Sequence, residues 1–223
     1  GAIHFDGSQA TEANASTVGF AVSGREILFD EGAAEWDGGA ATLPSPFAHI
    51  VVATDGFLWS EIPGGVYSYD LATGKSHWVG PGMIVHAAAD RVAVWYCDRN
   101  LSCGWDVRAF DGRQLSEFVL AERPPRLRLD PSCRFYGLVE NSDDSTAKII
   151  DLDSGDTLSS VTFVSSNAVP LNFTTGGDYF GVLSGSEVLV LSANGGYDSV
   201  HIGTETEVMD AVLHDNSSAA KCD

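Results

Sequence analysis

The chain has 223 residues, 44% of them hydrophobic, and a formal net charge of −19. This length suits one domain of moderate size, and no stretch approaches the roughly 18 to 20 apolar residues that a membrane helix needs. Nucleic-acid binding depends on neutralising phosphates with Lys and Arg, so 31 acidic residues against 12 basic ones exclude DNA and RNA as expected partners.

Five short apolar segments recur along the chain at a nearly constant spacing. They end at residues 30, 70, 111, 151 and 192, which gives intervals of 40, 41, 40 and 41 residues. A repeat of about 40 residues with four short β segments is typical of a β-propeller blade. The five segments are Glu26–Asp30, Val66–Asp70, Val107–Asp111, Lys148–Asp151 and Val188–Ser192.

Segments rich in β-branched and aromatic residues, separated by Gly, Asp, Asn and Pro, predict the strands of each repeat. The first repeat is the least regular. The expected strands of the first two repeats are Ile3–Phe5, Val18–Val22, Arg25–Phe29, Ala40–Leu43, Phe47–Ala53, Gly56–Ser60, Val66–Asp70 and His77–Val79.

The later repeats show the four-segment pattern more clearly, because polar turns bound nearly every apolar run. The expected strands of the third to fifth repeats are Met83–Ala89, Arg91–Tyr96, Trp105–Phe110, Leu115–Leu120, Arg126–Leu129, Phe135–Glu140, Ala147–Asp151, Leu158–Phe163, Val169–Thr174, Tyr179–Leu183, Glu187–Leu191 and Ser199–Ile202.

These elements predict an all-β chain that forms one β-propeller domain over residues 1–223, with about five four-stranded blades. Residues 205–223 are expected to close the ring as a final strand or to begin a further blade of a larger propeller. The expected blades span about 1–43, 44–81, 82–122, 123–165 and 166–204.

Val66–Lys75 resembles the blade motif of quinoprotein-like and YVTN-type propellers, and Lys148–Asp156 resembles it again. The resemblance implies an architecture that many unrelated functions share, and it implies no activity. The tryptophan-docking motif of quinone-cofactor propellers is absent from the sequence, so we expect no quinone cofactor.

The four cysteines and the asparagines indicate the compartment. Cys97 and Cys103 flank a polar segment between two apolar runs, so a disulfide across that hairpin is expected, which favours an oxidising compartment. The pairing of Cys133 and Cys222 stays open. Acceptor patterns for N-glycosylation add to the expectation of a secreted or cell-surface glycoprotein, and they occur at Asn14, Asn100, Asn172 and Asn216.

Binding residues are expected on the loops between second and third strands and on the connections between blades, because rigid scaffolds present contacts there. Many of these loop residues are acidic, so a cation, Ca²⁺ or a basic protein surface is the expected guest. Trp59 and Trp105 adjoin the same loops, where they could stack on a glycan or anchor a protein partner, or pack at the blade edges instead. The disulfide loop is the first choice of contact element. The candidate binding residues are Trp59, Glu61, Asp98, Arg99, Asn100, Trp105, Asp143 and Asp144.

No motif assigns catalytic residues or a metal site. The oxygen-rich segment Asn141–Ser145 could hold Ca²⁺, but without EF-hand spacing a solvated hairpin is the preferred interpretation. His86 and Arg126 begin innermost strands, where they could meet an anion or serve the structure alone. The leading hypothesis is a non-enzymatic interaction propeller, such as the ectodomain of a surface protein. The alternative is a carbohydrate-active or lactonase-like hydrolase with a carboxylate or metal site in the central channel.

Overall fold

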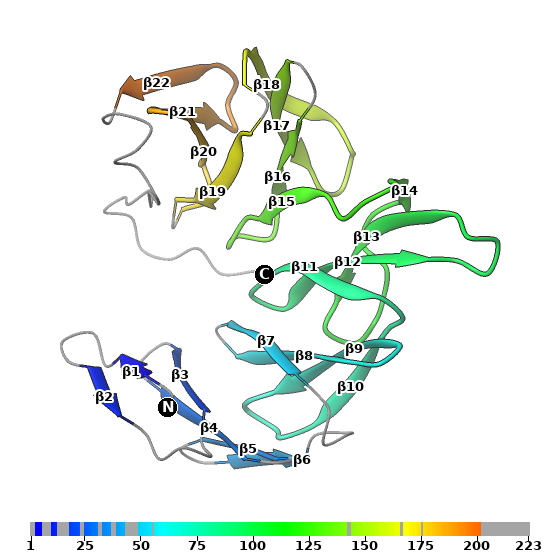
Figure 1. Cartoon of the computed structure of the whole chain (residues 1–223). Helices are drawn as coiled ribbons and strands as arrows, with labels where there is room; N and C mark the ends of the chain where they lie inside the picture. Colours follow the sequence, from blue (N-terminus) through cyan, green and yellow to red (C-terminus); the bar gives the residue numbers. More distant parts are fainter. Residues whose placement is uncertain are drawn as a thin grey trace.

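The computed structural model describes residues 56–141, 144–165, 167–174 and 176–201 with their side chains, and the backbone of the strands within residues 1–55. Every regular element in these residues is a β-strand. The described residues contain no helix long and apolar enough to cross a membrane. Twenty strands form five antiparallel sheets of four strands each (Figure 1). The predicted all-β propeller of about five four-stranded blades is therefore confirmed.

In all five sheets each strand pairs with the next one along the chain. We call the first sheet blade 1 and the other four blades 2 to 5. Their strands are β7 (His49–Thr54), β8 (Phe57–Ile62), β9 (Gly65–Asp70), β10 (Ser76–Gly80), β11 (Met83–Ala88), β12 (Arg91–Cys97), β13 (Cys103–Ala109), β14 (Val119–Leu120), β15 (Arg126–Leu129), β16 (Phe135–Glu140), β17 (Ser145–Asp151), β18 (Thr157–Phe163), β19 (Val169–Phe173), β20 (Tyr179–Ser184), β21 (Glu187–Ser192) and β22 (Tyr197–His201).

Blade 1 differs from the sequence prediction. Ile3–Phe5, expected as its first strand, is β1 and pairs with a missed strand, β2 (Ala10–Glu12), in a separate two-stranded sheet. The segment that ends at Asp30 is the second strand of blade 1, whereas those that end at Asp70 and Asp151 are third strands. The strands of blade 1 are β3 (Val18–Val22), β4 (Arg25–Asp30), β5 (Ala33–Trp36) and β6 (Gly39–Thr42).

The outer strand of blade 3 is much shorter than the expected Leu115–Leu120. The reason is local hydrogen bonding around Val107, the residue that would otherwise continue the ladder. Its N–H donates to the Oγ of Ser116 (2.9 Å), and its carbonyl accepts from the N–H of Leu115 (2.7 Å). Because a side chain takes this backbone donor, only the two residues of β14 pair with β13.

Apolar cores lie between neighbouring blades. The first strands β11 and β15 pack side by side, as do β15 and β19, so they form the inner side of the assembly (Figure 1). Fully buried members include Trp59 between blades 2 and 3, Leu127 between blades 3 and 4, and Phe180 between blades 4 and 5. Each blade therefore depends on its neighbours to bury its faces, as expected for a repeat architecture.

The repeated Asp and Gly residues close the turns between third and fourth strands. The Asp151 carboxylate accepts hydrogen bonds from the N–H groups of Ser154 (2.8 Å) and Asp153 (3.1 Å). The bond from Ser154 is the largest factor that lowers the pKa of Asp151. Gly155 follows with φ of 74°, a left-handed conformation that suits glycine. The recurring motif thus specifies a tight turn, which is why its spacing predicted the blades.

A small residue on β16 is needed for blades 4 and 5 to approach. A Cβ at Gly137 would lie 2.5 Å from the ring of Phe180, which is fully buried and stacked on Phe173. We expect Gly137→Ala to lower the free energy of unfolding by about 1 to 3 kcal/mol through overpacking, as measured by urea denaturation.

A double variant provides the control for this prediction. Phe180→Leu removes the ring atoms that the new methyl group would meet, so Gly137→Ala should cost less in that background than in the parent chain. If the two costs are simply additive, the clash is not the cause of the loss.

Candidate functional site

Antiparallel pairing places two kinds of connection on one face of the molecule. Because successive hairpins turn at opposite ends of a sheet, the loops between second and third strands share an end with the connections between blades. We call this end the loop face. It carries the loop Asp98–Ser102 of blade 3 and the connection Ala121–Pro125 between blades 3 and 4.

The loop after β12 is fixed at its base by a disulfide and in its interior by hydrogen bonds to Asp98. Cys97 and Cys103 face each other across β12 and β13 and form the predicted disulfide. The carboxylate of Asp98 accepts hydrogen bonds from the N–H groups of Asn100 (2.8 Å) and Ser102 (2.9 Å). Both bonds end on Oδ1, so Asp98 holds the loop from inside through one of its two carboxylate oxygens.

A depression of about 580 Å³ lies on the loop face between blades 3 and 4. Its floor includes Trp105 and Leu138, and its rim includes Glu122, Arg123 and Arg126. A second hollow of about 420 Å³ adjoins it toward the disulfide loop. The depression and this hollow form one continuous surface, because both are lined by Leu120, Ala121 and Glu122.

The two tryptophans among the candidate binding residues are core residues. Trp59 is 0% exposed and Trp105 is 2% exposed. Trp105 packs edge-on against Tyr136 of blade 4, with ring centroids 5.3 Å apart. Neither indole presents a face on which a sugar could stack. Both side chains instead pack in the cores between blades.

The charged candidates lie in different places. Glu61 is half-buried and accepts a hydrogen bond from the N–H of Ile84, which ties blade 2 to blade 3. Arg99 and Asn100 are exposed on the disulfide loop, and Asp144 is exposed after β16. Asp143 lies outside the described residues. Of the predicted binding residues, Trp105 is the one that lines the depression, and the disulfide-loop candidates lie on the same loop as Leu101, which lines the adjoining hollow.

The glycosylation candidates also differ in access. Asn100 is exposed on the disulfide loop, whereas Asn172 is half-buried on β19, where its side-chain nitrogen donates to the carbonyl of Phe173 (2.8 Å). Asn14 and Asn216 lie outside the described residues. Of the two that can be assessed, only Asn100 is placed where an enzyme could reach it.

Sequence reasoning missed the exposed apolar residues at this site. Leu101 is 84% exposed and Leu120 is 73% exposed, and both line the smaller hollow. Leu101 sits in a turn, where apolar periodicity gives no signal. The only sequence clue was a leucine inside a short polar loop flanked by cysteines.

Arginine side chains join neighbouring blades through main-chain carbonyls. Five described arginines donate in this way, which satisfies buried backbone acceptors and draws adjacent sheets together. The donor and acceptor pairs are Arg91 with Cys133, Arg108 with Val79, Arg126 with Ala168, Arg128 with Leu171, and Arg134 with Gly176. These arginines have structural partners, and bonds to neutral carbonyls leave their positive charge in place.

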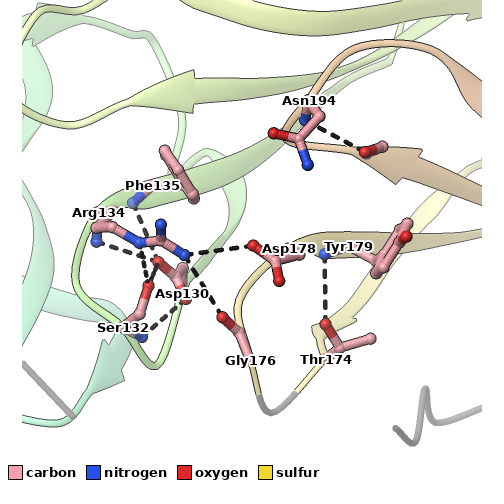
Figure 2. Close-up of polar contacts among 10 residues, drawn as sticks. Asp130, Ser132, Arg134, Phe135, Thr174, Gly176, Asp178, Tyr179 and Asn194 are labelled. Carbon is pink, nitrogen blue, oxygen red and sulfur yellow. Dashed lines mark hydrogen bonds and ion pairs between the residues drawn. The ribbon is translucent and has the colours of Figure 1, made fainter. Parts of the chain in front are cut away.

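The junction of Arg134 shows how these links are built at the end opposite the loop face (Figure 2). Arg134 reaches from blade 4 to the Gly176 carbonyl (3.5 Å) and to the carboxylate of Asp178 (3.4 Å) in blade 5. Fully buried Asp130 organises the turn below it, accepting from the N–H groups of Ser132 (2.8 Å) and Arg134 (3.1 Å). This cluster is internally satisfied and is a structural junction.

The innermost strands carry the two residues expected near the channel mouth. His86 on β11 accepts a hydrogen bond at Nδ1 from the N–H of Leu129 (3.1 Å), and Arg126 donates to the carbonyl of Ala168 (2.8 Å). Both therefore contact the main chain of the next blade. In the part of the chain that the structure describes, no three His, Cys, Asp or Glu residues gather closely enough to hold a metal ion.

Cys133 is also disulfide-bonded, and it lies in the turn between β15 and β16. Cys222 lies outside the described residues. The described cysteines are thus all oxidised, as the sequence analysis expected for Cys97 and Cys103.

Comparison with known proteins shows the architecture. No family model and no curated protein match the sequence. Among solved structures, Kluyvelomyces marxianus Hsv2 matches with a TM-score of 0.51 and 10% identity over 76% of this chain and 56% of that chain. Kluyveromyces lactis Hsv2 matches with a TM-score of 0.54 and 10% identity over 83% of this chain and 64% of that chain.

A third match, the Dos1 propeller, has a TM-score of 0.49 and 12% identity over 81% of this chain and 56% of that chain. At 10% identity the likeness to the two Hsv2 structures shows the β-propeller fold alone, and it does not distinguish a quinoprotein-like or YVTN type. This chain spans less than two thirds of each of these three chains.

Proposed function

We propose that this chain is a non-enzymatic interaction propeller that works outside the cytoplasm, in a secreted or cell-surface protein, and binds a protein partner on its loop face. One observation carries the proposal. A continuous depression between blades 3 and 4 lies beside a disulfide-held loop, and two strongly exposed leucines, Leu101 and Leu120, line it. Exposed apolar surface with a polar rim is typical of protein interaction sites.

The disulfides support the compartment. Cys97 is exposed and Cys103 is half-buried, so glutathione could reach the bond between them in a reducing cytosol. Such bonds persist in oxidising compartments. Asn100, on the same loop, is an exposed acceptor for N-glycosylation, which is consistent with export.

A protein fits this surface better than a glycan. Sugar sites commonly place an aromatic face under the ring, but Trp105, the one aromatic side chain among the described residues that line the main depression, is buried. Leucine side chains at the rim instead suit an apolar side chain of a partner.

The hydrolase alternative required carboxylates or histidines converging on the central channel. On the described inner strands the titratable side chains near the channel include His86 and Arg128, and both bond to the main chain. No specific observation in the described residues favours hydrolysis, so the interaction scaffold is the function proposed.

The test uses the full, oxidised chain and a displayed library of random linear peptides. Peptides selected on the immobilised chain are examined by hydrogen–deuterium exchange of the complex. We expect protection in Cys97–Cys103, Ala121–Arg126 and Leu138–Asn141. Protection confined to the hairpins at the opposite end would contradict the site, and binding on a glycan array with no selected peptide would contradict a protein partner.

A further inference from the structure

We infer that the partner bound on the loop face continues along the seam between blades 3 and 4 and places a lysine or arginine side chain in a hollow on that seam. This inference rests on the proposed interaction function and specifies the partner's chemistry. Three observations carry it, which are the continuity of this hollow with the main depression, the acidic character of all its charged lining residues, and a buried tyrosine hydroxyl that has no hydrogen-bond partner among the described residues.

A further hollow of about 620 Å³ lies between blades 3 and 4, and we call it the seam hollow. One wall is formed by Gln114–Glu117 and Val119 of blade 3, and the other by Tyr136 and Asp151–Gly155 of blade 4. Val119 also lines the main depression, so the depression and the seam hollow are continuous. The turn Asp151–Gly155 follows β17 at the end opposite the loop face, so the seam hollow extends the depression away from that face. A segment bound on the loop face can therefore continue into it.

Every charged residue that lines the seam hollow is acidic. Glu117 lies on one wall, and Asp151 and Asp153 lie on the other. Glu117 and Asp153 are exposed and make no ion pair with the described residues. The N–H of Ser154 lowers the pKa of Asp151, so this carboxylate is also ionised at neutral pH. The main depression is balanced by contrast, because two glutamates and two arginines line it.

Tyr136 adds a polar group that the described part of the fold leaves without a partner. It is 8% exposed, and it lines the seam hollow. Its ring packs edge-on against Trp105, but its hydroxyl makes no hydrogen bond to the described residues. Burial raises the pKa of Tyr136, so the hydroxyl keeps its proton at neutral pH, and its oxygen can accept from an N–H donor. Because an unsatisfied buried polar group is costly, a donor that enters the hollow and binds this oxygen is favoured.

A basic side chain of a partner fits this hollow better than a bare metal ion. Ca²⁺ takes about six to eight oxygen ligands at once, and the described residues offer no group of three His, Cys, Asp or Glu that could hold a metal. Lysine and arginine instead carry several N–H donors on a long stem, so one side chain can reach the Tyr136 hydroxyl and the carboxylates of the walls. The charge of −19 on the whole chain attracts a basic partner in the same direction. Among the guests expected from the sequence, a basic protein surface is therefore the one that suits this hollow.

The experiment compares two displayed peptide sub-libraries on the full, oxidised chain. Both contain random apolar residues, interspersed with Lys and Arg in one sub-library and with Asp and Glu in the other. We expect enrichment of the basic sub-library. The affinity of a selected synthetic peptide should fall about tenfold or more for Tyr136→Phe and for the double variant Glu117→Gln/Asp153→Asn. Added salt should weaken binding to the parent chain and affect the double variant much less.

The variants are chosen so that misfolding cannot explain the loss. Tyr136→Phe keeps the ring packing and removes only a hydroxyl without a partner among the described residues, so the thermal unfolding temperature should be unchanged or higher. Glu117 and Asp153 are exposed, so their replacement by amides should leave that temperature nearly unchanged. The matched control, Glu187→Gln/Asp198→Asn, removes two exposed acidic charges from blade 5 and should bind the peptide as the parent chain does.

Hydrogen–deuterium exchange of the peptide complex separates the two proposals. We expect protection in Gln114–Val119 and Asp151–Gly155 in addition to the loop-face segments. Protection of the loop face without these two segments overturns this inference and leaves the proposed function standing. Enrichment of the acidic sub-library, no preference between the sub-libraries, or unchanged affinity in either seam variant also overturns it. If protection leaves the loop face altogether, both fail.

Discussion

Replacing Asp106 by alanine is expected to lower the free energy of unfolding by about 3 to 5 kcal/mol, because a buried arginine would lose its counter-charge. Asp106 on β13 is fully buried, and its carboxylate accepts from Nε (2.7 Å) and Nη2 (3.1 Å) of Arg108. It also accepts from the hydroxyl of Tyr96 (3.2 Å). Arg108 is itself buried, and its remaining contacts are the Val79 carbonyl and the Tyr96 ring.

Urea denaturation of two further variants tests this explanation. Asp106→Ala combined with Arg108→Met removes both charges, so the double variant should regain most of the stability that the single variant loses. Glu140→Ala breaks the partly exposed pair with Lys148 and should cost less than about 1 kcal/mol. Equal losses for Asp106→Ala and Glu140→Ala would show that burial of the Arg108 pair does not determine its contribution.

The blades could be predicted because their turns are specified locally. Asp151 and Gly155 form a closed hydrogen-bonded turn with residues only a few positions apart, so the same sequence motif appears wherever that turn recurs. Blade 1 is harder to predict. Its strand β5 (Ala33–Trp36) has two alanines and weak β-propensity, and only pairing with β4 and β6 identifies it.

Side-chain direction could not be predicted at the site, and Trp59 shows why. A half-exposed strand alternates buried and exposed residues, but β8 buries Leu58, Trp59 and Ser60 in succession because blades cover both of its faces. Nearness to a loop in sequence therefore did not place the indole on the surface. Leu101 shows the opposite case, since its exposure follows from a turn geometry that the Asp98 carboxylate imposes.

The arginine links between blades were equally hidden from sequence reasoning. Arg91 and Arg134 lie 43 positions apart and each donates to a carbonyl 42 residues further along the chain. Such a contact joins two blades that only the three-dimensional arrangement brings together. The two links are therefore equivalent contacts one repeat apart, although neither segment alone predicts its contact.

Lowering the pH from 7 to 5 is expected to cost the chain about 2 kcal/mol of folding free energy through His86 alone, and more than about 3 kcal/mol at pH 4. Burial lowers the pKa of His86 to about 3, and the positive charge of Arg128 acts in the same direction. In the unfolded chain the imidazole has a pKa of about 6.5. The unfolded state therefore binds the extra proton between these values, and stability falls as the pH falls through that window.

His86→Gln separates this effect from the titration of other groups. A glutamine amide oxygen can accept the hydrogen bond that Leu129 donates to Nδ1 of His86, but it binds no proton in this range. Urea denaturation at pH 7, 6 and 5 should show a shallower pH dependence for the variant, by about 1 kcal/mol for each pH unit below 6. Parallel curves for the two proteins would mean that His86 has the same pKa in the folded and the unfolded chain, which its burial and the nearby Arg128 both oppose.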